Sequence, residues 1–155
     1  MYRTKEQLER LLREWGAQAI EFRDRVVGEA QVIELRFVWM FEDIPLSARF
    51  RLATDEDDLR ERSRHGRTGQ VLETKLERNR ANWGRESLRL LYMFLKTSLH
   101  AVDEGVITAE QLFMPWFEDN EGRVLSEVLD LYQLSKGMSA GQLMGQTTKL
   151  LAAGG

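Results

Sequence analysis

The stretch AQVIELRFVWMFEDIPLSARFRL, residues 30–52, carries the strongest structural signal in the chain. From Ile33 to Phe41, large apolar residues alternate with other residues, which is the period-two pattern of a strand with one buried face. Turn residues follow at 42–45, and the apolar alternation then resumes from Leu46 to Leu52. We therefore predict two antiparallel strands joined by a tight turn. The basic residues expected on the exposed face of these strands are Arg36, Arg49 and Arg51.

Helical periodicity comes before this hairpin. Thr4 and Gln7 form a capping-box pattern, leucines at i, i+3 and i+4 follow, and Gly16 suits a left-handed helix end. We predict a helix over residues 4–15 and a short first strand over residues 17–23. The sheet is then a meander of two or three strands.

The chain after the hairpin is predicted to be mainly helical. Residues 54–57 suit the start of a short helix, and the Arg-rich segment after them ends at residues 65–69, which are predicted to form a mobile loop. A single helix from Gln70 to Glu104 would be about 52 Å long, against a radius of gyration of roughly 15 Å for a domain of this size. We predict a break at Asn82–Gly84, because glycine costs about 1 kcal/mol inside a helix. The helix after it has apolar residues on most sides, which predicts a buried central helix.

Signals for helix ends recur in the C-terminal third. Gly105 is predicted to end the central helix, and Thr108 opens a second capping box, followed by a short helix through Trp116. A turn at residues 119–122 and a last helix over residues 124–136 complete the pattern.

The predicted fold class is α+β: an N-terminal helix, a small antiparallel meander, and a helical C-terminal half around a central buried helix. Residues 1–145 are predicted to form a single domain, and residues 146–155 a frayed tail.

The composition excludes several chemistries. The 155 residues include no cysteine and two histidines, which excludes disulfides, thiolate metal sites and cysteine nucleophiles. We interpret His100 as a hydrogen-bonded residue of the core or its boundary, and the acidic residues 118–121 as an exposed turn without the spacing of an EF-hand. No cofactor and no metal site is predicted. No apolar run reaches membrane-helix length and no signal peptide is recognisable, so we expect a cytoplasmic protein.

Charge is distributed unevenly along the chain. Residues 59–89 hold nine basic and four acidic side chains, whereas residues 101–155 hold three basic and eight acidic ones, although the net charge is only −3. Eight of the nine basic residues are arginine, which forks onto phosphate and stacks on bases. Pairing along an exposed helix is the competing interpretation. The candidate nucleic-acid-binding residues are Arg49, Arg51, Arg60, Arg62, Arg64, Arg67, Arg78, Arg80 and Arg85.

One pattern suggests an enzyme. Asp58, Glu73 and Lys75 have the spacing of a D…E-x-K metal-nuclease motif. That motif belongs on a strand after a turn, whereas Glu73 lies at the start of a helical pattern. We therefore predict no enzyme activity and no catalytic residues.

A series of helix signals runs from Trp83 to Val124. The first predicted helix begins with Trp83-Gly84-Arg85 and ends in Asp103-Glu104-Gly105. It is followed by a Thr-capped helix that contains Phe113 and by a turn at Gly122-Arg123. This arrangement resembles an uncharacterised family of small proteins encoded in phage and prophage genomes. The resemblance implies a genomic context, and with it the cytoplasm of the host cell, but it carries over no catalytic residue.

We expect a non-enzymatic accessory protein of a phage or mobile element that binds nucleic acid in replication, recombination or regulation. The alternative is an inhibitor of a host defence or transcription complex that acts through its acidic C-terminal half. A second copy of the chain is a third partner that the long apolar helix leaves open. The residues assigned to a protein partner are Trp116, Phe117, Glu118 and Asp119.

Overall fold

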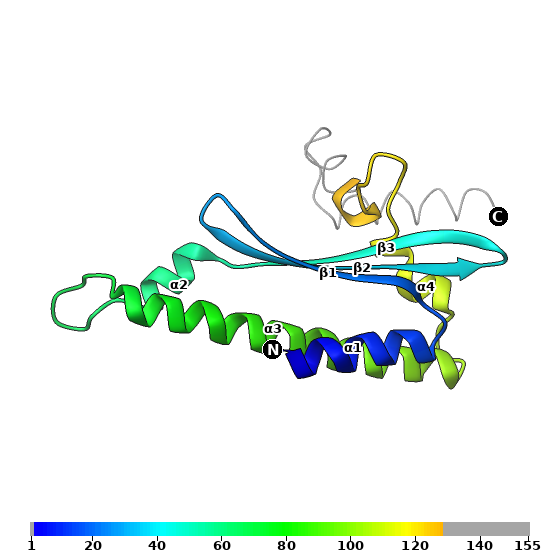
Figure 1. Ribbon diagram of the computed structural model, residues 1–155, viewed down its shortest axis with the longest axis horizontal. Coiled ribbons are helices and arrows are strands. Elements are labelled where there is room, and N and C mark those ends of the chain that lie inside the picture. Colours follow the sequence, from blue (N-terminus) through cyan, green and yellow to red (C-terminus); the bar gives the residue numbers. More distant parts are fainter. Residues whose placement is uncertain (1, 129–155) are drawn as a thin grey trace, which may run out of the picture.

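The fold is built on three antiparallel strands (Figure 1). A computed structural model describes residues 2–128, and within them the strands are β1 (Gln18–Val27), β2 (Ala30–Phe41) and β3 (Ile44–Ala53). They pair in the order β1-β2-β3 through two hairpins. The second hairpin turns at Glu42 and Asp43, whose φ angles of 45° and 65° are typical of the primed turns that match strand twist. The predicted meander is confirmed, with three strands.

Helices cover one face of this sheet. α1 (Tyr2–Glu14) and α3 (Glu73–Asp103) pack against each other on that face, and α4 (Ala109–Phe113) follows α3 (Figure 1). α2 (Glu56–Arg62) packs on α3, and a single 3-10 turn, η1 (Met114–Trp116), returns the chain to β3. This order of elements confirms the predicted α+β class.

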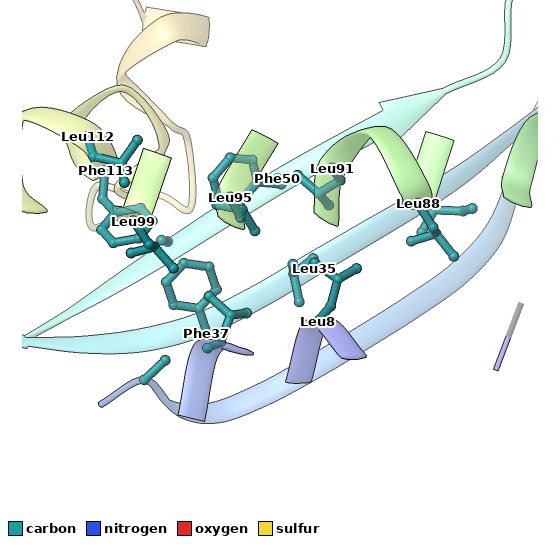
Figure 2. Close-up of a cluster of buried hydrophobic side chains, with 14 residues drawn as sticks. Leu8, Leu35, Phe37, Phe50, Leu88, Leu91, Leu95, Leu99, Leu112 and Phe113 are labelled. Carbon is teal, nitrogen blue, oxygen red and sulfur yellow. The ribbon is translucent and has the colours of Figure 1, made fainter. Parts of the chain in front are cut away.

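The hydrophobic core lies between the helices and the inward face of the sheet (Figure 2). The ring of Phe37 on β2 stacks on Phe50 of β3 at a centroid distance of 6.1 Å and meets the edge of Phe113 of α4 at 5.4 Å. Each buried leucine contributes roughly 1.5–3 kcal/mol, so the helix–sheet contact is the main source of stability. The leucines that α1 and α3 bury in this core are Leu8, Leu12, Leu88, Leu91, Leu95 and Leu99.

α3 is continuous, so the predicted break at Asn82–Gly84 is wrong. Its 31 residues form a helix about 46 Å long, which runs along the sheet and on to α2 (Figure 1). Gly84 is buried on the same helix face as Leu88 and Leu91. Burial of this face stabilises the helix by more than the roughly 1 kcal/mol that glycine costs.

α3 is also less buried than its sequence predicts. Leu90, Met93 and Phe94 are 67%, 63% and 41% exposed, because α1 and the sheet cover only one side of the helix. The prediction of a helix buried on most sides is therefore wrong. α3 is instead a surface helix with one buried stripe and a partly apolar outer surface.

The helix ends follow the predicted signals with one exception. Gly16 and Gly105 adopt φ angles of 90° and 74° at the ends of α1 and α3, and Thr108 forms the predicted capping box with Gln111. The exception is Thr4, which lies inside α1 because that helix begins at Tyr2.

Some predictions fall outside the part of the chain that the structure describes. These are most of the helix at 124–136, the domain limit at 145 and the tail at 146–155. Among residues 2–128, no helix is long and apolar enough to cross a membrane.

Candidate nucleic-acid interface

The predicted Arg-rich segment forms the end of the molecule where α2 meets α3. Ser63 is fully buried there: its hydroxyl donates to the Leu59 carbonyl at 2.6 Å and accepts a hydrogen bond from Asn79 Nδ2 of α3 at 2.9 Å. The following loop, predicted to be mobile, is closed by backbone hydrogen bonds, including one from the His65 N–H to the Gln70 carbonyl at 2.8 Å. α2, the loop and the start of α3 therefore hold their basic residues in defined positions.

Four arginines of this Arg-rich segment form ion pairs within the protein. The pairs are Arg60–Glu29, Arg62–Asp58, Arg64–Glu61 and Arg80–Glu56, with N–O distances of 3.0, 2.9, 2.7 and 2.6 Å. The last pair is the most buried, with the Glu56 side chain 11% exposed. The hydrogen bond from Arg80, followed by one from Thr54, holds the pKa of Glu56 below its ordinary value against the opposing effect of burial. Arg80 thus joins α3 to α2.

The outward face of the sheet is partly covered by residues 117–127, part of the orange segment in Figure 1. The Glu118 N–H donates to the Ser47 carbonyl at 2.8 Å, and the Glu118 carboxylate accepts hydrogen bonds from the Arg36 guanidinium, the shortest at 2.7 Å. The expectation that Arg36 lies exposed is therefore wrong. The reason is that a segment more than 80 residues away along the chain supplies its counter-ion.

Arg49 is a largely covered member of the same network. Its side chain is 12% exposed and lies within ion-pair distance of Glu34, Glu118 and Glu127, at 3.5, 3.2 and 2.8 Å. The predicted exposure of Arg49 is wrong for the same reason as for Arg36. Arg51, two residues further along β3, is exposed as predicted. We conclude that Arg49 stabilises the fold and that Arg51 is accessible to a ligand.

Four exposed basic side chains line the outward face of α3. They stand at i, i+7, i+11 and i+18, which places them within about 40° of one another around the helix. Among the described residues, no carboxylate lies within ion-pair distance of any of the four. We call this set the α3 basic stripe, and its members are Arg78, Arg85, Arg89 and Lys96.

The side chains of the stripe are partly positioned by neighbours on the same helix. Arg85 donates a hydrogen bond to Asn82 Oδ1 at 2.6 Å, and the Lys96 ammonium lies 5.8 Å from the centroid of the Tyr92 ring. Arg67 lies exposed in the loop before α3. Arg89 and Lys96 were not among the predicted site residues. Their signal is the 4-7 spacing from Arg85, which a helix after Gly84 already places in line, and Arg78 joins this line because α3 is continuous.

The residues assigned to a protein partner have contacts inside the fold. The half-buried Trp116 stacks on Phe50 at 4.7 Å, and Phe117 contacts Phe113 at 6.5 Å. Glu118 pairs with the sheet arginines, as described above, and Asp119 pairs with Arg123 at 3.0 Å. The hydrogen bond from the Arg123 backbone N–H, supported by a second from Glu121, lowers the pKa of Asp119 against the opposing effect of burial. These side chains hold residues 117–123 against β3.

The residues of the nuclease pattern lie on two helices, α2 and α3. Asp58 pairs with Arg62, whereas Glu73 and Lys75 stand two residues apart at the start of α3, a spacing that directs them to different sides of a helix. The helical spacing therefore does not favour the strand-borne arrangement of a metal nuclease.

The two histidines lie on the surface. His65 Nδ1 accepts backbone N–H groups of its own loop, and His100 is exposed, so the prediction of a core or boundary position for His100 is wrong. Within residues 2–128, His100, Asp103 and Glu104 have ligand atoms within 4.8 Å of one another, all on exposed side chains. Their signal in the sequence is the i, i+3, i+4 spacing. Exposed groups of this kind are common without a bound ion.

No protein-family model matches the chain, and neither a curated protein nor a solved structure matches it. The resemblance of Trp83–Val124 to small phage proteins therefore stays a prediction.

Proposed function

We propose that this protein is a non-enzymatic accessory protein that binds nucleic acid through the α3 basic stripe. The observation that carries the proposal is the alignment of Arg78, Arg85, Arg89 and Lys96 on one exposed face of α3, without carboxylate partners among the described residues. The phage context stays a prediction from the sequence resemblance.

The dimensions of the stripe suit a phosphate backbone. From Arg78 to Lys96 the helix rises about 27 Å, whereas the phosphates of one strand follow each other at about 3.4 Å along a duplex. A helix lying along or across a backbone therefore brings several phosphates within reach of long basic side chains. Arginine favours this role because its guanidinium binds phosphate in a fork geometry.

Some of the predicted arginines extend the surface and others do not. Arg62 and Arg64 are 70% and 48% exposed, and their pairs with neighbouring acids are surface pairs that contribute little to stability. These two arginines can exchange a carboxylate for a phosphate at small cost, and Arg67 and Arg51 are also exposed. Arg49 and Arg80 are omitted, because releasing them would break partly buried ion pairs.

The proposal is tested by fluorescence anisotropy of labelled single-stranded DNA, duplex DNA and RNA at about 50 and 200 mM salt. A protein that contacts several phosphates should lose orders of magnitude in affinity when the salt is raised over this range. The test variant is Arg78→Glu with Arg85→Glu. It should weaken binding and flatten the salt dependence by about one unit of log–log slope for each phosphate that the variant no longer neutralises.

The matched control is Arg10→Glu with Arg13→Glu, which changes the net charge equally on the exposed face of α1. It should retain most of the affinity. Equal losses in the two double variants would show that only net charge matters and would count against a site on α3. Wild-type binding by the stripe variant, or no binding by the wild-type protein at the lower salt, would refute the proposal.

A further inference from the structure

We propose that the nucleic acid bound here is single-stranded, with unpaired bases seated in an apolar groove between β3 and α3. This inference rests on the proposed function, because it assigns the substrate class of the same surface. The basic stripe alone does not discriminate between single strands and duplexes, since both present phosphates. The groove beside the stripe supplies the discrimination.

The groove is lined by apolar side chains, of which Phe50 is buried and Trp116 and Phe94 keep exposed surface. Phe50 and Leu52 of β3, Leu90 and Phe94 of α3, and Trp116 line it. Although they are partly packed, Phe94 is 41% exposed and Leu90 is 67% exposed. An apolar surface of this kind fits the flat faces of unpaired bases.

The aromatic rings are held in place before any ligand binds. Trp116 stacks on Phe50 at 4.7 Å with 23° between the ring planes, and the edge of Phe94 meets Trp116 at 5.6 Å. Because these contacts fix the rings, a base that stacks on them pays little additional cost for ordering side chains.

The groove and the basic stripe form one continuous surface. At 100° per residue, the positions Arg89, Met93, Leu90 and Phe94 follow one another around α3 from the stripe to the groove. Arg51 contributes to the β3 wall of the groove, although the alternation along β3 directs its side chain to the outward face of the sheet. A single strand laid across α3 therefore meets the basic stripe beside an apolar groove, which is the combination that binds strands through backbone and bases together.

A duplex does not use the groove in this way. Its bases are stacked inside the helix and its outer surface is lined by phosphates, so the apolar residues Leu90, Met93 and Phe94 would face charged groups. A duplex is therefore expected to gain only the phosphate contacts of the stripe.

One side chain opposes the proposed ligand and provides a test in the other direction. Glu86 is exposed one helical turn before Leu90, and it lies beside Arg85 and Arg89. A carboxylate at this position repels phosphate. Glu86→Gln should therefore strengthen binding of a single strand by about two- to fivefold at low salt, and the gain should shrink as salt rises.

The decisive experiment compares labelled oligothymidine of about 20 nucleotides with a duplex of equal length, by anisotropy at low salt. Phe94→Leu removes the ring but keeps an apolar side chain, and Leu90→Ala truncates an exposed residue that the fold does not need. Each variant should lower the affinity for oligothymidine and leave the affinity for the duplex within about twofold. For Phe94→Leu, which removes a stacking ring, the loss should be about fivefold to a hundredfold. The control is Val106→Ala, an apolar residue that is 73% exposed and lies just beyond the C-terminal end of α3.

The outcomes separate this inference from the proposed function. A single-strand site is supported if the wild-type protein binds oligothymidine more tightly than the duplex. This preference should be lost in the groove variants and kept in the control. Preference of the wild-type protein for the duplex, or unchanged single-strand affinity in both groove variants, overturns it while the stripe proposal stands. If Arg78→Glu with Arg85→Glu also changes neither affinity, the proposed function itself fails.

Discussion

Replacing Arg49 by methionine tests whether this arginine holds the fold together or serves the surface. Arg49 is 12% exposed and lies among Glu34, Glu118 and Glu127, of which Glu34 is 2% and Glu118 is 8% exposed. Methionine keeps the length and apolar character of the side chain and removes only the guanidinium. The substitution therefore leaves two nearly buried carboxylates without a shared counter-ion.

The cost follows from the partners that remain. Breaking a buried ion pair costs about 3–5 kcal/mol when it leaves an uncompensated charge. Here Glu34 keeps Arg25 at 2.7 Å and Glu118 keeps Arg36 at 2.7 Å, so neither carboxylate is isolated. We therefore expect a loss at or below the low end of this range, about 2–3 kcal/mol, which corresponds to a fall of roughly 5–10 °C in Tm for a protein of this size.

Urea unfolding followed by circular dichroism measures the free energy of unfolding directly. The control is Arg51→Met, the same change two residues along β3 at an exposed position, for which we expect less than about 0.5 kcal/mol. Combining Arg49→Met with Glu34→Leu should cost less than the two single changes together, because the second change removes one of the nearly buried carboxylates that the first deprives of a counter-ion. Equal effects of Arg49→Met and Arg51→Met would show that the burial of Arg49 has no energetic consequence.

Three further predictions test other parts of the fold. Leu95→Ala should lower the free energy of unfolding in urea by about 2–5 kcal/mol, because Leu95 is fully buried on α3. Leu90→Ala should lower it by less than about 0.5 kcal/mol, because Leu90 is 67% exposed. Similar losses in the two variants would contradict the one-sided burial of this helix. Glu56→Gln should flatten the acid side of the Tm–pH profile: the folded state lowers the pKa of Glu56, so its stabilisation is present above the ordinary value of 4.5 and is lost as the pH falls through the lowered pKa. Gly105→Ala should lower stability by about 1 kcal/mol, because Gly105 has a φ of +74°, whereas Gly66→Ala, at a residue without positive φ, should have a smaller effect.

The sheet was predictable because its signal is local. The alternation in residues 30–52 places most of the large apolar side chains on one face, and a period of two is satisfied by a strand whatever the rest of the chain does. The second capping box and the glycine helix ends were predictable for the same reason. Each depends on residues within one turn of the position where the signal acts.

The continuity of α3 was not predictable from local preference. Asn82 and Gly84 favour a helix end by about 1 kcal/mol, but the buried face of α3 gains more from its contacts with α1 and the sheet. Those contacts join residues far apart in the sequence, and their strength cannot be judged from a window around Gly84.

The ion pairs of the sheet were not predictable either, because they also join residues far apart in the sequence. Arg36 reaches Glu118 across 82 positions and Arg49 reaches Glu127 across 78, so an alternating pattern that correctly gave their face could not show that this face would be covered. The short-range pairs, such as Arg62–Asp58 and Arg64–Glu61, were the kind of pairing that the sequence did suggest.

The continuity of α3 also determines what the charge bias of the chain means. A surplus of arginine in residues 59–89 is compatible with many scattered side chains, and the structure does divide it: Arg60 and Arg80 join elements, whereas Arg78 and Arg85 lie on an open face. A break at Gly84 would have set Arg78 and Arg85 on separate axes. Because the helix passes through Gly84 without interruption, the two arginines fall into line with Arg89 and Lys96, and the same rotation carries Leu90 and Phe94 toward β3. One helix therefore presents charge on one side and apolar surface on the next, and a ligand that satisfies both must expose phosphates and bases together.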